Sequence, residues 1–222
     1  MTFSAAWDTA FQASTHISVW PWSDLVSYVN RYAKAPDGYQ RILELGCGVG
    51  ANIPFFLRSG VDYCAVEGSQ AAVARLHEAY PQLREKVVLG DFTRSIPFAG
   101  PFDLVVDRSA LTCNATDAVR HGLKLVFERL RTGGKYLGLD WFATDHQDAR
   151  AGDEVDPHTR TNLSSGLLAD LGAIHFSDQS HLLDLFRSTG FRVDRLEHKV
   201  SEVTFPENRG KSAWWHVVAT KP

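Results

Sequence analysis

Short apolar runs alternate with segments of helical periodicity along the first two-thirds of the chain. Runs of strand length occur at 41–45, 63–67, 86–89, 102–107 and 135–140. The segments between them, such as 70–80 and 116–130, repeat apolar residues with the period of an amphipathic helix. Because the runs are nearly continuous in apolar character, both faces of each strand are expected to be covered. The pattern predicts a parallel sheet with helices on both faces.

The pattern changes after this region. A polar stretch precedes a predicted helix at about 178–189, and two strand-like runs, 191–204 and 213–220, follow with only a short turn between them. Such neighbours are expected to pair as an antiparallel hairpin. The predicted fold class is therefore α/β, with a seven-stranded, mostly parallel sheet, helices on both faces and a C-terminal antiparallel hairpin.

The 222 residues are expected to form one domain over 1–222. Within it we expect an N-terminal lid and helix at 1–35 and a substrate-side insertion at 143–176. Ser69 and Thr116 are expected to cap the helices that follow them.

The first apolar run ends in glycines at alternate positions. Gly46, Gly48 and Gly50 follow it, and a helical pattern begins at Ile53. Glycine adopts positive φ and lets a ligand approach the backbone, while a helix N-terminus offers unpaired N–H groups. This order of strand, turn and helix is typical of a site for a nucleotide-like ligand.

Two ligand classes use such a turn. Gly46-x-Gly48-x-x-Ala51 satisfies the dinucleotide fingerprint, with Glu67 about twenty residues further on to hold a ribose. Together with Glu44 the same residues spell E-x-G-x-G-x-G, which resembles motif I of the class I S-adenosylmethionine-dependent methyltransferases. The glycine pattern alone leaves both classes open.

Features outside the turn favour the methyltransferase family, which the chain resembles from about residue 42 to its C-terminus. A parallel sheet closed by an antiparallel hairpin is not the usual dinucleotide fold, and 222 residues leave little chain for a separate substrate domain. The resemblance implies an enzyme with S-adenosylmethionine as its cofactor. The alternatives are a methyltransferase-fold protein that binds a ligand without turnover and, further off, an NAD(P)-dependent oxidoreductase.

The resemblance also implies roles for individual residues. The glycine loop would pass against the methionine moiety, with Glu44 bracing it, and Glu67 would accept both ribose hydroxyls. Asp91 would meet the adenine amine beside Phe92. The segment 130–134 is similar to the L-x-P-G-G turn of the family. The full set expected to bind the cofactor is Trp22, Glu44, Gly46, Cys47, Gly48, Asn52, Glu67, Gly68, Ser69, Asp91, Phe92 and Asp107.

The catalytic residues are argued from position. The acceptor must approach the methyl group above the carboxyl ends of the fourth and fifth strands, where Asp140 is expected to end its strand and His146 to lie in the next loop. We therefore expect Asp140, with His146 as second choice, to orient or deprotonate the acceptor. His175 and His181 are further candidates, and no metal is expected.

The aromatic N-terminus is expected to form a lid over the cofactor. Trp7, Phe11, Trp20 and Trp22 lie within its first 22 residues, whereas a disordered tail is poor in aromatics.

Composition and charge narrow the partners. A net charge of −3 and a pI near 6.3 disfavour a nucleic-acid partner, and no apolar run has the length of a membrane span. The signature [DN]-P-P-[YF] of base amino-group methylation is absent after the fourth strand. The expected acceptor is a small molecule: a sugar, a nucleotide-sugar, or a metabolite hydroxyl or amine. Three cysteines without a C-x-x-C pair, and no visible signal peptide, are typical of a reducing cytoplasm.

Overall fold

The computed structural model describes residues 5–14, 17–34, 38, 41–205 and 210–222. Parts of the expected lid, 1–4, 15–16 and 35, therefore lie outside the described residues. The helices are α1 (Ala5–Gln12), α2 (Ser23–Tyr28), α3 (Ile53–Arg58), α4 (Gln70–Ala79), α5 (Thr116–Arg129) and α6 (Gln179–Thr189). The strands are β1 (Arg41–Leu45), β2 (Asp62–Glu67), β3 (Val87–Leu89), β4 (Phe102–Arg108), β5 (Leu130–Phe142), β6 (Asp153–Asp156), β7 (Thr159–Thr161), β8 (Ile174–His175), β9 (Arg192–Glu202) and β10 (Lys211–Thr220).

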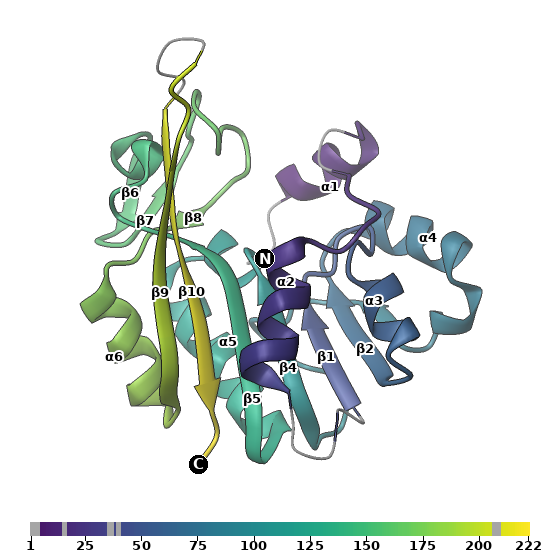
Figure 1. Ribbon diagram of the computed structural model, residues 1–222. Coiled ribbons are helices and arrows are strands. Elements are labelled where there is room, and N and C mark those ends of the chain that lie inside the picture. The colour runs from purple at the N-terminus through teal and green to yellow at the C-terminus, as the bar shows by residue number, and fades with distance from the viewer. Residues whose placement is uncertain (1–4, 15–16, 35–37, 39–40, 206–209) are drawn as a thin grey trace.

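The main sheet has seven strands in the order β3-β2-β1-β4-β5-β10-β9 (Figure 1). Strands β1 to β5 run parallel to one another, while β10 is antiparallel to both β5 and β9. The predicted fold class is confirmed, including the C-terminal hairpin. The insertion of β10 between β5 and β9 distinguishes this sheet from the dinucleotide-binding order, in which the sixth strand follows the fifth directly.

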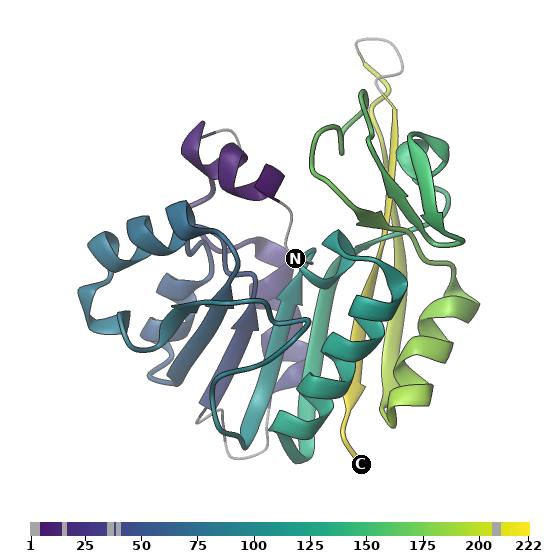
Figure 2. The same cartoon turned by 180° about the vertical axis from the view of Figure 1, so that it is seen from behind.

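Helices cover both faces of this sheet, because successive side chains of each strand point to opposite sides. In β1, Leu43 and Leu45 pack in a core with residues of α5 and α6, which lie on the face seen in Figure 2. Ile42 packs on the opposite face, in a core with residues of α2, α3 and α4. The near-continuous apolar runs are therefore explained by burial on two sides.

The insertion has a structure of its own. Strands β6, β7 and β8 form a small three-stranded sheet within the region 143–176, where the sequence indicated only a polar stretch. Its core contains Leu163, Leu168, Leu171, Ile174 and Phe176. These residues are separated by polar turns and have no regular period, so the sequence pattern did not show the sheet.

Two of the expected helix boundaries were wrong. Ser69 caps α4 as predicted, since its Oγ accepts a hydrogen bond from Ala72 N at 3.1 Å. Thr116 is instead the first residue of α5, and its hydroxyl donates to Asp156 of β6 at 2.8 Å. Residues 130–134, expected as a turn, belong to β5.

The described helices include none long and apolar enough to cross a membrane. Cys47, Cys64 and Cys113 are free thiols, and all three are buried.

Candidate active site

A cavity of about 570 Å³ lies at the carboxyl ends of the parallel strands. Residues at or just after the ends of β1, β2, β3 and β4, together with the last residue of β5, line its floor. Its walls come from the N-terminal segment and the insertion, which stand on opposite sides above these strand ends (Figure 1). This is the edge at which open α/β sheets bind ligands.

The turn after β1 requires its glycines. Gly46 has φ 62°, and a Cβ there would lie 2.4 Å from Ala110 Cβ. Gly48 has φ 55°, and a Cβ there would lie 3.3 Å from the ring of Phe11 in α1. Both glycines line the cavity. The backbone of this turn is therefore presented directly to whatever occupies the cavity.

Glu44 links the residues after the glycine turn to β2 through hydrogen bonds. Its carboxylate is buried and accepts hydrogen bonds from Tyr63 Oη at 2.6 Å and from Asn52 Nδ2 at 2.7 Å. Burial raises the pKa of Glu44 to about 6, although both hydrogen bonds oppose this shift. Asn52 also lines the cavity. The oxygen of its side-chain amide, Oδ1, is buried and has no hydrogen-bond partner among the described residues. A buried acceptor of this kind suits a ligand with a donor group.

Glu67 is the last residue of β2 and lines the same cavity. The residue is only 4% exposed. Its Oε2 accepts from Gly48 N at 2.7 Å, and its Oε1 accepts from Ser69 N at 2.8 Å. Burial raises its pKa, and these backbone N–H groups oppose the shift. Because each carboxylate oxygen has a second lone pair, the group can still accept two hydroxyl donors.

Asp91 and Phe92 follow β3 and also line the cavity. Asp91 Oδ1 accepts hydrogen bonds from Thr93 N at 3.0 Å and Thr93 Oγ1 at 2.6 Å, which orient the carboxylate. The Phe92 ring is almost fully buried beside it. An acceptor next to an aromatic face is the arrangement that a purine amine and ring require.

The N-terminal segment also lines the cavity. Trp7 and Phe11 of α1 line it, as does Trp22 at the start of α2. Asp8 Oδ1 attaches α1 to the first turn of α4, accepting from Ser69 Oγ at 2.5 Å and from Ala71 N at 3.0 Å. The backbone N–H of Ala71, followed by the Ser69 hydroxyl, lowers the pKa of Asp8. The lid itself stays a prediction; Trp7, Phe11 and Trp22 line the cavity, whereas Trp20 is exposed and does not.

Several expected cofactor contacts lie outside the cavity lining. Gly68 and Ser69 do not line it; Ser69 caps α4 and binds Asp8 instead. Asp107 is fully buried, and its carboxylate accepts from the N–H groups of Ala110 and Leu111, from Tyr136 Oη and from Trp141 Nε1. Four donors satisfy this carboxylate within the core, so the structure gives Asp107 a structural role instead of a cofactor contact.

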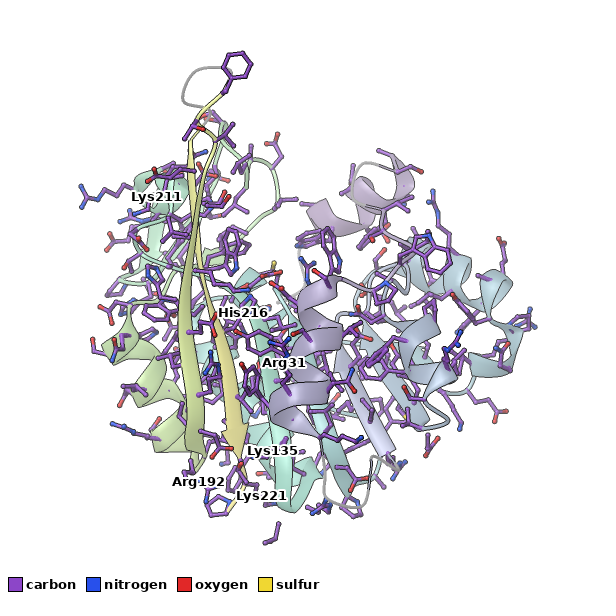
Figure 3. The ribbon with its side chains drawn as sticks, in the orientation of Figure 1. Arg31, Lys135, Arg192, Lys211, His216 and Lys221 are labelled. Carbon is purple, nitrogen blue, oxygen red and sulfur yellow. The ribbon has the colours of Figure 1, made fainter. Side chains whose placement is uncertain are left out.

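Asp140 also does not line the cavity. Its Oδ2 lies 2.5 Å from Arg108 Nη2, and its Oδ1 lies 3.0 Å from Nε2 of the buried His216. His216 comes from β10 (Figure 3). Burial raises the pKa of Asp140, but the His216 hydrogen bond and the Arg108 charge outweigh it and hold the pKa below its usual value. A carboxylate with a lowered pKa and two partners is a poor proton acceptor.

His146 lies in the insertion, also away from the cavity. It is 5% exposed, its Nδ1 accepts from Asp148 N at 3.1 Å, and its ring packs against Phe142 and Phe176. Burial lowers its pKa. His146 therefore has a local structural role at the start of a short helical turn.

The other candidate histidines form a separate cluster. His175 Nε2 and His181 Nε2 are 3.1 Å apart, and the His158 and His181 rings stack at 3.5 Å. Burial, followed by the neighbouring imidazoles His181 and His158, lowers the pKa of His175 to about 3. Burial and His158 lower that of His181 to about 4. Within the described ranges no three metal-ligating side chains come together as a metal site.

The cavity contains residues that the sequence analysis missed. Arg108 and Phe142 are the last residues of β4 and β5, one and two positions beyond the aspartates that were expected to end these strands. The Arg108 guanidinium lies 4.0 Å from the centre of the Trp22 ring. Leu168 and Leu171 reach the cavity from the insertion. Only the strand boundaries could have revealed Arg108 and Phe142 in advance.

Comparison with known proteins identifies the fold. Residues 42–134 match a family described as a methyltransferase domain. The ribosomal RNA small subunit methyltransferase A of Porphyromonas gingivalis is 37% identical over 51 residues, which are 23% of this chain and 20% of that protein. The chain therefore matches about a fifth of the length of this curated relative.

Solved structures resemble the chain over most of its length. An S-adenosylmethionine-dependent methyltransferase from Methanosarcina mazei superposes with a TM-score of 0.67 and 16% identity, over 91% of this chain and 98% of that one. The glycopeptide N-methyltransferase MtfA gives a TM-score of 0.62 and 18% identity, over 95% of this chain and 99% of that one. At such identities the likeness concerns the fold.

Proposed function

We propose that this chain is a class I S-adenosylmethionine-dependent methyltransferase and that it methylates a small molecule held between its N-terminal segment and its insertion. The observation that carries the proposal is the cavity of about 570 Å³ in which the glycine turn, Glu67 and Asp91 meet the aromatic residues of both walls. Its volume lies within the range of small-molecule sites. The dinucleotide alternative is not retained, because both the family and the strand order differ from it.

The cavity residues fit this cofactor. S-adenosylmethionine supplies a methyl group on a positively charged sulfur atom. Glu67 offers two oxygens to a ribose diol, and Asp91 with Phe92 offers an acceptor and a ring to adenine. The unpartnered Asn52 Oδ1 and the exposed glycine backbone suit the methionine portion. The walls exclude water and align the acceptor, which supplies much of the rate in such a displacement.

A small molecule is favoured over RNA as the acceptor. The chain has a net charge of −3, whereas proteins that bind nucleic acid carry a basic surface. The match to the RNA methyltransferase covers only 51 residues. The glycopeptide N-methyltransferase, by contrast, matches this chain over 95% of its length. We accordingly propose a sugar, a nucleotide-sugar or another metabolite as the acceptor class.

The first experiment is calorimetric titration with S-adenosylmethionine, with S-adenosylhomocysteine and with NAD. We expect the two sulfur ligands to bind and NAD not to bind. Glu67→Gln should weaken binding by about 1–3 kcal/mol, because a charged acceptor of the ribose hydroxyls is lost. The exposed Glu85 on the loop before β3 provides the matched control, and Glu85→Gln should leave affinity unchanged.

The second experiment identifies the acceptor class. The protein is incubated with S-adenosylmethionine carrying a labelled methyl group, together with either the low-molecular-mass fraction of a cell extract or total RNA. Label in small molecules is the expected result. Label in RNA alone would refute the acceptor class, and binding of NAD alone would refute the proposal as a whole.

A further inference from the structure

The acceptor side of the cavity is built from three parts of the chain. Here it means Trp7 and Ile17 of the N-terminal segment, Arg108 and Cys113 at and after the end of β4, and Phe142, Leu168 and Leu171 of β5 and the insertion. Glu67 and Asp91, which the proposed function assigns to the cofactor, come from the end of β2 and the residues after β3 and are not counted in it. Most of these side chains are apolar, so the acceptor side suits an apolar body.

The polar side chains that line the cavity after β4, on and beside the acceptor side, already form hydrogen bonds within the protein. Ser109 Oγ donates to Asp140 O at 3.1 Å, and Cys113 Sγ donates to Ser109 O at 3.1 Å. Asn114 Nδ2 donates to the backbone oxygens of Ala110 and Leu111. None of these groups is poised to receive a proton from the acceptor.

No described side chain on the acceptor side can act as a general base. The cavity lining within the described ranges includes no histidine, lysine or tyrosine, and Asp140 and His146 lie outside it. Burial raises the pKa of Cys113 to about 12, so this residue is a neutral thiol. A hydroxyl acceptor has to lose its proton during transfer, and this side of the cavity offers no group to take it.

Arg108 provides no net charge to compensate. Its guanidinium lies 2.5 Å from the Asp140 carboxylate, so the pair is neutral as a unit. The apolar acceptor side, where the Arg108–Asp140 pair is neutral, disfavours a thiolate or alkoxide and equally disfavours an ammonium ion. A neutral amine is the one common nucleophile that such surroundings favour in its reactive form.

We infer that the acceptor is a neutral amine on an apolar body, methylated without a general base; this inference rests on the proposed function. The nitrogen lone pair forms the new N–C bond while the C–S bond breaks and its electron pair remains on sulfur. The positive charge thereby moves from sulfur to nitrogen. The product ammonium gives its proton to water after it leaves, so the transfer itself requires no protein base.

The test uses 2-phenylethylamine, 2-phenylethanol and 2-phenylethanethiol, which share one apolar body and differ in the nucleophile. Each is titrated into the complex with S-adenosylhomocysteine, in two buffers of different ionisation enthalpy. The amine is protonated in neutral solution, so binding as the free base should release about one proton per amine. Labelled methyl transfer should then proceed to the amine at least about tenfold faster than to the alcohol or thiol.

The outcomes separate this inference from the proposed function. If S-adenosylhomocysteine binds but the amine releases no proton, is not methylated, or is slower than the alcohol or thiol, the inference is wrong and the proposed function survives. If neither sulfur ligand binds, the proposed function fails. His16 lies outside the described residues, so His16→Asn is included; a loss of about a hundredfold in kcat with a lost ionisation in its pH profile would reveal a base and overturn the inference.

Discussion

Replacing Asp8 by alanine is expected to speed release of the cofactor while leaving the fold intact. The Asp8 carboxylate attaches α1 to α4 through Ser69 Oγ and Ala71 N, and α1 places Trp7 and Phe11 in the cavity lining. Ser69 N also donates to Glu67, so the same short segment joins the lid to the expected ribose acceptor. Undocking α1 should therefore open the cofactor side of the cavity.

The magnitude follows from these contacts. Hydrogen bonds to a charged group contribute about 1.5–3 kcal/mol when they are desolvated. Asp8 is only partly buried, so screening by solvent reduces the contribution to about 1 kcal/mol. This corresponds to roughly fivefold faster dissociation of S-adenosylhomocysteine, if docking of α1 closes the site. Asp8→Asn keeps one oxygen acceptor and loses the charge, so its effect should be smaller.

The contact between Asp8 and the first turn of α4 depends on pH. Hydrogen bonds from Ala71 and Ser69 lower the pKa of Asp8 in the folded protein. A lowered carboxyl pKa stabilises the docked state above the unfolded value of 3.8, and this stability is lost as the pH falls through the lowered pKa. The effect of Asp8→Ala should therefore be fully present at neutral pH.

The assay is stopped-flow displacement of S-adenosylhomocysteine, with calorimetric affinity and thermal unfolding measured on the same samples. Glu78, exposed on α4, is the matched control, and Glu78→Ala should leave the dissociation rate unchanged. An unchanged rate in Asp8→Ala would refute the lid. So would a loss of affinity that merely parallels the loss of stability, because α1 would then be ordinary packing.

Three further predictions concern the turn, the histidines and Asp140. Gly46→Ala should lower the free energy of unfolding, measured in urea, by about 2–4 kcal/mol, since its Cβ would lie 2.4 Å from Ala110 Cβ. Gly60 also has a positive φ, 69°, but open space around it, so Gly60→Ala should lower this free energy by only about 1 kcal/mol. Equal losses in the two variants would contradict the close approach at Gly46. The pKa of His175 is about 3 in the folded protein and 6.5 ordinarily, so the free energy of unfolding should fall as the pH drops below 6.5. In His175→Asn, denaturation experiments across this pH range should show a shallower decline of the free energy of unfolding. An equally steep decline would remove His175 as a cause. Asp140→Asn should leave the shape of the pH–rate profile unchanged, because Asp140 is paired with Arg108 and does not line the cavity; loss of an ionisation from that profile would restore it as the base.

The sequence by itself determined the features that depend on residues close together in the chain. Gly46, Gly48 and the helix start after them form one local unit, so their spacing predicted the turn that now borders the cavity. Glu67 and Asp91 could be placed because the carboxyl ends of parallel strands meet at one edge of a sheet. Continuous apolar runs predicted the covered sheet, and the short connection predicted the antiparallel hairpin.

Only the tertiary structure decided which strand-end side chains enter the cavity. Neighbouring residues of a strand point to opposite faces, so a shift of one position separates the buried Asp107 from the cavity residue Arg108. Asp140 was diverted from the acceptor by partners distant in sequence, Arg108 and His216, which no local pattern could indicate. Side-chain direction and long-range pairing are properties of the packed sheet, and they place the predicted catalytic aspartate outside the cavity lining.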